Sequence, residues 1–384
     1  MKKLGVAIIG CGNIAVAHVR GFKELATRCE VRAFCDMYEE KAKSLAERFD
    51  YQDITTTDDY RTLLDHDDID VVSICLPPSE HCTITVDFLE AGKHVIVEKP
   101  MAPSLHECDA MIAAQEKSGK ILSVISQNRF KDDPMRIKQM LEAGDFGKVL
   151  FARVNSMWWR GTNYYDLWWR GTYEQEGGGC TLIHAIHQID ILQWLVGMPK
   201  SVYSVMSNLA HPNSEVEDLS LSILRYENMF AQVASTLVEH DEKQELLFAA
   251  ENASFSIPWS LKAVTQRPNG FFDPDEAMLQ TLTSRFESLG TLAYERHTAQ
   301  FEDIFLAIEE GGTPIVDGVQ GRNAVELVCA MYKSSVEGVE VTLPIATDDP
   351  FYTTEGMLSK LIRYNKKLKS VENLEDSDIT LGTT

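Results

Sequence analysis

The chain has 384 residues, of which 44% are hydrophobic and 24% charged, as is ordinary for a folded protein of two domains. Its 36 basic and 58 acidic residues give a formal net charge of −22, which argues against nucleic acid or an anionic membrane surface as a partner. No apolar stretch approaches the ~18–20 residues that span a bilayer, and the first residues lack a signal peptide's apolar core. The eight cysteines form no CxxC pair, so we expect reduced thiols in a cytoplasmic protein.

The first predicted element is a short buried strand over residues 6–9, followed by a glycine-rich turn. The turn, GCGNIA at residues 10–15, matches the G-x-G-x-x-A motif, and apolar residues then recur at helical spacing. In this order of strand, turn and helix, Gly10 permits the tight turn, Gly12 lets the backbone approach a pyrophosphate, and the helix N-terminus supplies N–H groups. On its own, the motif also fits an ordinary glycine-rich turn between a strand and a helix.

A second predicted strand, residues 31–35, ends in Asp36. An acidic residue at this place hydrogen-bonds the ribose hydroxyls of a dinucleotide's adenosine and repels the 2′-phosphate of NADP. Met37 follows, where an Arg or Lys could otherwise take that phosphate. Together with the glycine-rich turn, the acidic residue therefore predicts NAD as the cofactor.

A third buried strand, residues 69–76, is followed by the sequence PPSEH at residues 77–81. The two prolines predict a rigid loop at the carboxyl end of the strand, ending at His81. We expect this loop to lie where the nicotinamide ribose of a bound dinucleotide would be.

The next apolar run, residues 95–97, ends in Glu98-Lys99-Pro100. A strand that ends here places Lys99 at the carboxyl edge of a parallel sheet, where open α/β sheets bind their ligands. Burial at such an edge can lower the pKa of a lysine enough for proton exchange near neutral pH, although many strand ends carry a solvated lysine. A last strand, residues 121–126, completes the first predicted domain, residues 1–128.

In the second predicted domain, an aromatic stretch, residues 158–172, follows a predicted helix and strand. It contains WWRGT twice and four of the six tryptophans of the chain. Aromatic faces and guanidinium groups suit the apolar faces and hydroxyls of a sugar ring, but they suit a subunit interface equally well.

A helix is predicted from about residue 182 to residue 195, with His184, His187 and Asp190 three residues apart on one side. Two histidines and a carboxylate at this spacing could ligate zinc. The same pattern fits two hydrogen-bonded histidines on a packed helix. Because no second cluster of ligands stands out, we predict no metal site.

The rest of the second domain, residues 129–350, alternates short β-like segments with two later helices around residues 297–309 and 320–336. The hairpin-length connections between residues 201 and 257 predict an antiparallel sheet. Residues 351–384 form a C-terminal extension with an amphipathic piece at residues 357–368 and a polar end that we expect to be flexible.

With GCGNIA, the strand ending in Asp36, EKP and GGG…HxxHxxD in this order, residues 4–345 resemble the Gfo/Idh/MocA family of sugar and inositol oxidoreductases. The resemblance implies an α/β protein: an N-terminal Rossmann dinucleotide-binding domain and a C-terminal α/β domain with a large open, mainly antiparallel sheet. Family members often use this sheet to form homo-oligomers, so a dimer or tetramer is expected. A small carbohydrate is the expected partner.

The resemblance also implies site residues. Lys99 would contact the hydroxyl being oxidised, His187 would be its acid/base partner, and Trp169-Arg170 would reach the cofactor from the second domain. We expect the cofactor to be bound by Gly10, Gly12, Asn13, Ile14, Asp36, Met37, Leu76, Pro77, His81, Glu98, Lys99, Gln127, Trp169 and Arg170. We expect the substrate to be bound by Asn128, Arg129, Tyr165, Asp166, Trp168 and His184.

The chain departs from the family at Ile183, because many members carry an acidic residue four positions before the histidine. We hypothesise that His184 replaces or reroutes the missing carboxylate of the proton relay. The leading functional prediction is oxidation of a ring hydroxyl, at C3, of a sugar or glycoside. The alternatives are an inositol dehydrogenase, a glycosidase that oxidises C3 transiently with tightly bound NAD, and a non-enzymatic sensor on the same fold.

Overall fold

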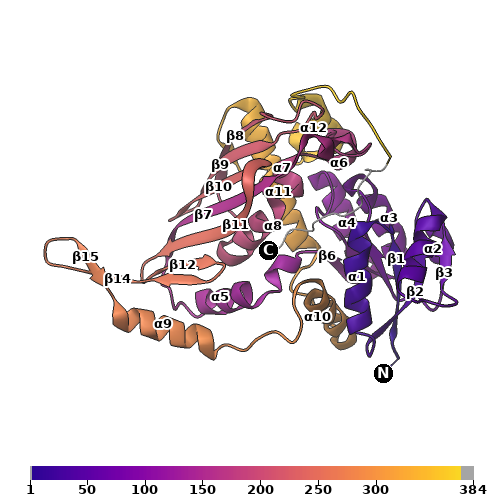
Figure 1. Ribbon diagram of the computed structural model, residues 1–384, viewed down its shortest axis with the longest axis horizontal. Coiled ribbons are helices and arrows are strands. Elements are labelled where there is room, and N and C mark those ends of the chain that lie inside the picture. Colours follow the sequence, from indigo (N-terminus) through magenta and orange to yellow (C-terminus); the bar gives the residue numbers. More distant parts are fainter. Residues whose placement is uncertain (1, 373–384) are drawn as a thin grey trace.

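A computed structural model describes residues 2–372 as two α/β domains side by side (Figure 1). The first contains a six-stranded parallel sheet of order β3-β2-β1-β4-β5-β6. Its strands are β1 (Leu4–Ile9), β2 (Cys29–Cys35), β3 (Thr55–Thr57), β4 (Val71–Ile74), β5 (His94–Val97) and β6 (Leu122–Val124). Its helices are α1 (Asn13–Glu24), α2 (Glu39–Arg48), α3 (Pro78–Glu90) and α4 (Leu105–Ser118), with a 3₁₀ turn η1 (Tyr60–Leu63).

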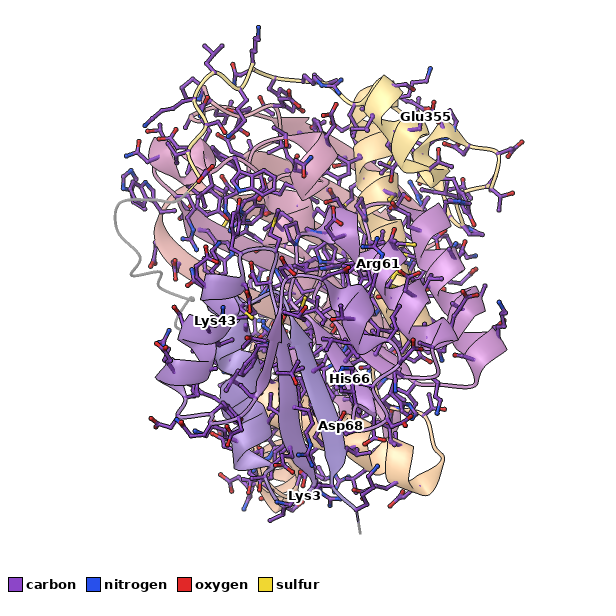
Figure 2. The ribbon with its side chains drawn as sticks, turned by 90° about the vertical axis from the view of Figure 1, so that its right-hand side faces the viewer. Lys3, Lys43, Arg61, His66, Asp68 and Glu355 are labelled. Atoms are coloured by element: carbon purple, nitrogen blue, oxygen red, sulfur yellow. The ribbon has the colours of Figure 1, made fainter. Side chains whose placement is uncertain are left out.

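The strand order reverses between β1 and β4, which makes the carboxyl ends of these strands the ligand-binding edge of a Rossmann sheet. Figure 2 shows the first domain in front, with Lys3, just before β1, at one end of the molecule. The strands run from there toward the middle of the molecule, so their carboxyl ends face the second domain. The predicted fold of the first domain is confirmed.

The first helix boundary after β4 differs from the prediction. Residues 78–81 form the first turn of α3 rather than a rigid loop. Pro78 occupies the first helical position, where proline's fixed φ suits a helix and its missing N–H would have no partner in any case. His81 therefore lies on a helix, beneath the strand end.

The second domain contains an eight-stranded sheet of order β13-β12-β11-β7-β10-β9-β8-β16. Neighbouring strands are antiparallel except for the parallel pair β7 and β10, so the sheet is mainly antiparallel as predicted. The strands are β7 (Val149–Trp159), β8 (Ser201–Ser207), β9 (Leu219–Arg225), β10 (Phe230–Thr236), β11 (Val238–Ala250), β12 (Ser254–Ile257), β13 (Ser260–Lys262) and β16 (Val341–Thr342).

Helices cover one face of this sheet and leave the other open (Figure 1). Further elements of the domain are η2 (Gln127–Arg129), α5 (Asp132–Glu142), η3 (Thr162–Asp166), α6 (Tyr173–Glu176), α7 (Cys180–Ile183), α8 (Ile186–Val196) and α11 (Gly318–Glu337). Along β7, inward-facing residues such as Val154 and Trp158 are buried, whereas alternate residues such as Phe151 are exposed. Exposed apolar side chains continue across the open face at Tyr203, Val205, Leu221, Ile223 and Phe230.

The helix predicted over residues 182–195 is two helices. The first, α7, ends at Ile183, and α8 begins at Ile186. The break at His184 and Ala185 places His184 between the helices rather than on one continuous helical face with His187.

Two later helices tie the domains together. α10 (Arg296–Glu310) packs on α1, where Gly21 lets the ring of Phe301 approach the backbone closely. α11 packs on α4 and β6, and a Cβ on Gly321 would lie 2.4 Å from the side chain of Val124. The interface between the domains is therefore closely packed.

Residues 260–292, which show no clear sequence pattern, begin with the edge strand β13. They continue as a projecting hairpin of β14 (Val264–Gln266) and β15 (Phe272–Pro274) and the helix α9 (Glu276–Ser288) (Figure 1). After η4 (Pro350–Tyr352), the amphipathic piece of the tail forms only a short helix, α12 (Thr354–Lys360). The polar end predicted to be flexible lies mostly outside the described residues. No helix within residues 2–372 is both long and apolar enough to cross a membrane.

Candidate active site

The glycine-rich turn lies at the carboxyl end of β1 and opens α1. Gly10 has φ of +91°, and a Cβ there would lie 2.4 Å from the carbonyl oxygen of Cys75. Gly12 has open space around its missing Cβ, and no side chain caps the N-terminus of α1. The open space and the free N–H groups of Asn13 and Ile14 fit a pyrophosphate.

Asp36 follows β2 at the same edge. One carboxylate oxygen accepts the backbone N–H of Cys11 at 2.8 Å, and the other accepts that of Tyr38 at 3.0 Å. The side chain is thereby fixed beside the glycine-rich turn, where it fits the ribose hydroxyls of an adenosine. The side chain of Met37 is exposed beside it.

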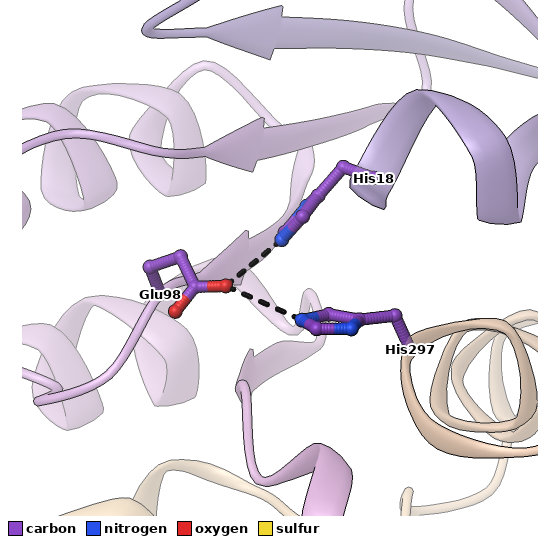
Figure 3. A group of neighbouring side chains, drawn as sticks. All are labelled: His18, Glu98 and His297. Atoms are coloured by element: carbon purple, nitrogen blue, oxygen red, sulfur yellow. Dashed lines mark hydrogen bonds and ion pairs between the residues drawn. The ribbon is translucent and has the colours of Figure 1, made fainter. Parts of the chain in front are cut away.

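Glu98 follows β5 and is buried among two histidines from different helices (Figure 3). Its carboxylate accepts a hydrogen bond from Nε2 of His18 at 2.9 Å and lies 3.6 Å from Nε2 of His297. Nδ1 of His18 bonds the hydroxyl of Ser73 at 2.7 Å. Burial alone would raise the pKa of Glu98, but the His18 hydrogen bond and the nearby His297 hold it well below its usual value.

The three side chains of this cluster offer ligand atoms within 4.8 Å of one another. A neutral His18 that donates to Glu98 and accepts from Ser73 accounts for the closest contacts by hydrogen bonds alone. The other Glu98 oxygen accepts the backbone N–H of Lys99 at 3.1 Å. The cluster thus holds Glu98 in place, and Glu98 in turn fixes the backbone of Lys99, the predicted catalytic lysine.

Lys99 reaches from the first domain to the second. Its Nζ donates a hydrogen bond to the carbonyl oxygen of Ile183 at 3.0 Å. Burial lowers the pKa of Lys99, and the nearby Arg170 lowers it further, whereas Glu98 opposes the shift. Across the domain boundary, the lysine thus meets a neutral backbone carbonyl.

His187 lies on α8 beside Lys99. Both line one small hollow at the domain boundary, together with Asn128 and Asp190. Burial lowers the pKa of His187 well below its usual value, and the charge of Lys99 lowers it further. The fold therefore brings together two proton-exchanging groups from different domains, at the edge where the glycine-rich turn and Asp36 lie.

His184 is buried close by. Its Nδ1 has no hydrogen-bond partner, and its Nε2 lies 3.4 Å from the hydroxyl of Tyr164. Burial lowers the pKa of His184 well below its usual value, as do the charges of Arg160 and Arg170. An imidazole in these surroundings is neutral and can accept or donate one proton.

Arg170 lies between two aromatic rings. Its guanidinium is 4.1 Å from the ring centroids of both Tyr164 and Trp169 and pairs with Glu176 at 2.8 Å. Sequence reasoning selected Tyr165 for the substrate and missed Tyr164. Both tyrosines stand in one 3₁₀ turn, so no periodicity distinguishes the one that faces His184.

Four predicted ligand-binding side chains already have partners within the protein. Arg129 is fully buried and makes a two-pronged ion pair with Asp190, at 2.7 and 2.6 Å. Tyr165 is also buried, and its ring packs edge-on against His211. Asp166 accepts hydrogen bonds from Lys369 and Asn213, and both ring nitrogens of His81 face backbone carbonyls at 2.9 and 2.8 Å. All four side chains are thus paired or packed with protein groups, and a direct contact of any of them with a ligand stays a prediction.

The other residues predicted to bind cofactor or substrate lie at different places around the site. Leu76 and Pro77 lie at the carboxyl end of β4, and the Leu76 side chain approaches Gly10. The side-chain oxygen of Gln127 is buried without a partner. Trp168 is partly exposed, and its backbone N–H bonds the carbonyl of Val371 in the tail.

Two family models match the chain. Residues 4–126 match the NAD-binding Rossmann fold of the oxidoreductase family GFO_IDH_MocA, and residues 138–343 match the C-terminal alpha/beta domain of the same family. Together they cover most of the chain, in the two domains described above.

Curated relatives are similar over different lengths. D-glucoside 3-dehydrogenase of Escherichia coli is 25% identical over 88% of this chain and 97% of its own. Inositol 2-dehydrogenase of Salmonella typhimurium is 27% identical over 50% of this chain and 54% of its own. The oxidoreductase YrbE of Bacillus subtilis is 29% identical over 59% of this chain, and the match spans 65% of YrbE.

Solved structures share the fold. The WlbA dehydrogenase of Chromobacterium violaceum, in complex with NADH and UDP-GlcNAcA, is 27% identical with a TM-score of 0.78, covering 90% of this chain and 97% of that one. Levoglucosan dehydrogenase in complex with NADH and levoglucosan is 22% identical with a TM-score of 0.76, covering 90% of this chain and all of that one. The chain belongs to the Gfo/Idh/MocA oxidoreductase family and binds NAD through its Rossmann domain.

Proposed function

We propose that the protein oxidises a secondary ring hydroxyl of a sugar, glycoside or cyclitol. The observation that carries the proposal is the hollow shared by Lys99 and His187 at the carboxyl edge of the NAD-binding sheet. When bound, NAD⁺ accepts a hydride from the carbinol carbon, so that CH–OH becomes C=O and one proton is released. The similarity to D-glucoside 3-dehydrogenase favours C3 of a pyranose as the oxidised carbon.

Lys99 and His187 handle the released proton in this proposal. The ammonium of Lys99 already donates to a carbonyl oxygen at 3.0 Å, so it can equally donate to the substrate oxygen and hold it in place. Burial keeps His187 neutral near pH 7, which leaves one ring nitrogen free to accept the proton. General acid–base groups of this kind contribute about 10²–10⁴-fold to a rate.

We propose that His184 and Tyr164 extend the proton path beyond these two residues. Their polar atoms lie 3.4 Å apart, and Nδ1 of His184 has no partner. We expect His184→Ala to lower turnover and to change its pH profile, and we expect His184→Gln to restore part of the turnover if positioning alone is required. An unchanged rate and pH profile in His184→Ala would show that the histidine only packs.

We further propose a homo-oligomer that acts in the cytoplasm. The open face of the large sheet exposes Phe151, Tyr203, Leu221, Ile223 and Phe230, an apolar patch that a second copy of the chain would cover. All eight cysteines are free, as expected in a reducing compartment. Light scattering of the purified protein would test the oligomer, because a monomer mass at micromolar concentration contradicts it.

The function is tested by screening sugars, glycosides and inositols for NADH formation, followed by NMR of the product to locate the ketone. The proposal expects a steady rise in NADH with at least one neutral carbohydrate and a much weaker signal with NADP. No NADH with any member of the panel would contradict it. Release of an aglycone at catalytic NAD, without net NADH, would instead indicate the glycosidase that oxidises C3 transiently.

A further inference from the structure

A larger cavity adjoins the hollow of Lys99 and His187. Its volume is about 370 Å³, near the lower end of the ~300–1,000 Å³ typical of small-molecule sites. Asn128 lines both spaces. Gln188, the residue after His187, also lines the cavity, and the charge of Lys131 in its wall acts on the imidazole of His187. A ligand in the cavity would therefore lie next to the hollow of Lys99 and His187, across Asn128.

Two amide side chains in the cavity wall, those of Gln188 and Gln244, use only half of their hydrogen-bonding groups. Nε2 of Gln188 donates to Oε1 of Gln244 at 2.6 Å. Oε1 of Gln188 and Nε2 of Gln244 have no partner, although Gln188 is 96% buried, with 4% of its surface exposed. Unpaired buried polar groups destabilise a fold unless a ligand or water pairs with them. The pair leaves one acceptor and one donor, and a hydroxyl group can satisfy both because it donates and accepts.

The charges of the wall favour an uncharged ligand. One ammonium, that of Lys131, stands against the carboxylates of Asp132, Asp133 and Glu295. Burial, together with the charge of the neighbouring Arg296, lowers the pKa of Lys131 to about 8. A phosphate or carboxylate would meet net repulsion here.

Apolar groups complete the wall. Ile191, Leu246, Ile257, Pro134 and Pro258 line the cavity beside the polar groups. A sugar ring presents the same mixture, with apolar C–H faces and hydroxyls around its edge. The lining thus matches a polyol ring better than an extended aliphatic chain, which has no hydroxyls for the amide pair.

We propose that this cavity binds a second, uncharged sugar ring, joined by a glycosidic bond to the ring that is oxidised beside Lys99 and His187. The inference rests on the proposed dehydrogenase function and narrows it. The substrates are neutral glycosides of two rings rather than free sugars, cyclitols or nucleotide-linked sugars.

The test compares substrates that share the reacting ring. Steady-state kcat/KM with NAD would be measured for D-glucose, methyl glucosides, the disaccharides cellobiose and maltose, and UDP-glucose. We expect kcat/KM for the better disaccharide to exceed that for glucose at least tenfold, with UDP-glucose below both. In Gln188→Leu and Gln244→Leu, we expect the ratio of the disaccharide value to the glucose value to fall about tenfold. Gln139→Leu, on the exposed side of α5, is the matched control and should keep the wild-type ratio.

Binding measurements separate the two proposals. Calorimetric titration of the NADH-loaded enzyme with cellobiose, maltose and glucose avoids turnover, because the reduced cofactor cannot accept a hydride, and thermal unfolding and NAD affinity verify that each variant folds. If no carbohydrate is oxidised, the proposed function fails. If carbohydrates are oxidised but both disaccharides bind no tighter than glucose, or the Gln188 and Gln244 variants leave the ratio unchanged, the cavity inference fails while the dehydrogenase proposal stands. Preference for UDP-glucose would likewise overturn the inference.

Discussion

The two walls of the candidate site are built in different ways. The NAD-binding edge consists of short motifs, each fixed by the strand that precedes it, as with Gly10 after β1, Asp36 after β2 and Lys99 after β5. The opposite wall consists of the aromatic stretch, residues 158–172, which contains little regular structure beyond β7 and is held by distant parts of the chain. Positions in the first wall follow from local sequence, whereas positions in the second depend on tertiary contacts.

The tail of the described chain holds the aromatic stretch in place. Nζ of Lys367 donates to the carbonyl of Leu167 at 3.0 Å, and Lys369 pairs with Asp166. The carbonyl of Asp166 accepts the backbone N–H of Val371 at 2.8 Å. Residues 367–371 of the tail are therefore part of the second wall and hold the loop that carries Tyr164 and Arg170.

The largest expected effect on stability tests whether Arg129 serves mainly to stabilise the fold or to bind the substrate. Arg129→Leu leaves Asp190 buried without its partner, so we expect a loss of about 3–5 kcal/mol in the free energy of unfolding by urea. Arg61→Leu, at an exposed position, should change it little. In the double variant Arg129→Leu/Asp190→Leu, most stability and measurable NADH formation should return. A stable but inactive double variant would instead place Arg129 in substrate binding.

Asp36 tests the NAD-binding wall. Asp36→Ala removes the predicted acceptor for the ribose hydroxyls and the contact with Cys11, so we expect the KM for NAD to rise about 10–100-fold, or ~1.4–2.7 kcal/mol, with a smaller rise for NADP. Asp68→Ala, at an exposed acidic position, is the matched control. Equal KM values for NAD in the two variants would contradict the role given to Asp36.

The buried histidines predict a pH dependence of stability. Burial lowers the pKa of His187 in the folded state, while its unfolded pKa is ~6.5. Its stabilisation is therefore present above about pH 6.5 and is lost as the pH falls, at up to ~1.4 kcal/mol per pH unit. Glu176 and Glu217, whose pKa values burial raises, act in the opposite direction.

A variant of His187 separates its contribution to the pH dependence from that of the two carboxyl groups. His187→Gln should flatten the slope of unfolding free energy against pH between about 5 and 6.5, whereas His66→Gln, at an exposed histidine, should leave it unchanged. Equal slopes in His187→Gln and the wild type would show that His187 does not stay neutral in the folded protein.

The smallest expected effect concerns the second wall. Lys367→Ala/Lys369→Ala removes side-chain bonds that hold the aromatic stretch, so we expect the KM for the carbohydrate to rise roughly threefold, ~0.65 kcal/mol, with NAD affinity unchanged. Lys366→Ala, at the exposed neighbouring position, is the control. A similar rise in the KM for NAD would mean that the tail acts on the whole fold.

The sequence predicts the first domain well because its signals are contiguous. A buried apolar run fixes each strand of the sheet, and the residue after the run must lie at the carboxyl edge. The two-domain architecture and the family follow from such motifs. The predicted start of α3 was wrong because a pair of prolines suits the N-terminus of a helix as well as a loop.

The second wall is less predictable for a physical reason. Whether Tyr164 or Tyr165 faces the site depends on His211 and on the tail, which are distant in sequence. From the sequence alone, Arg129 looks like a ligand-binding residue, because its ion-pair partner Asp190 is 61 positions away in the chain. No local pattern reveals the break between α7 and α8, because the apolar residues around it continue at helical spacing.

The most direct test compares Lys99→Ala with the wild type in two measurements, calorimetric NAD binding and NADH formation with the best carbohydrate. Because the glycine-rich turn and Asp36 hold the cofactor, we expect NAD affinity to stay within about twofold. Because we propose that Lys99 orients the reacting hydroxyl, we expect turnover to fall about 10²–10⁴-fold. Lys117→Ala, at an exposed lysine, should match the wild type in both measurements. Full turnover in Lys99→Ala would contradict the account.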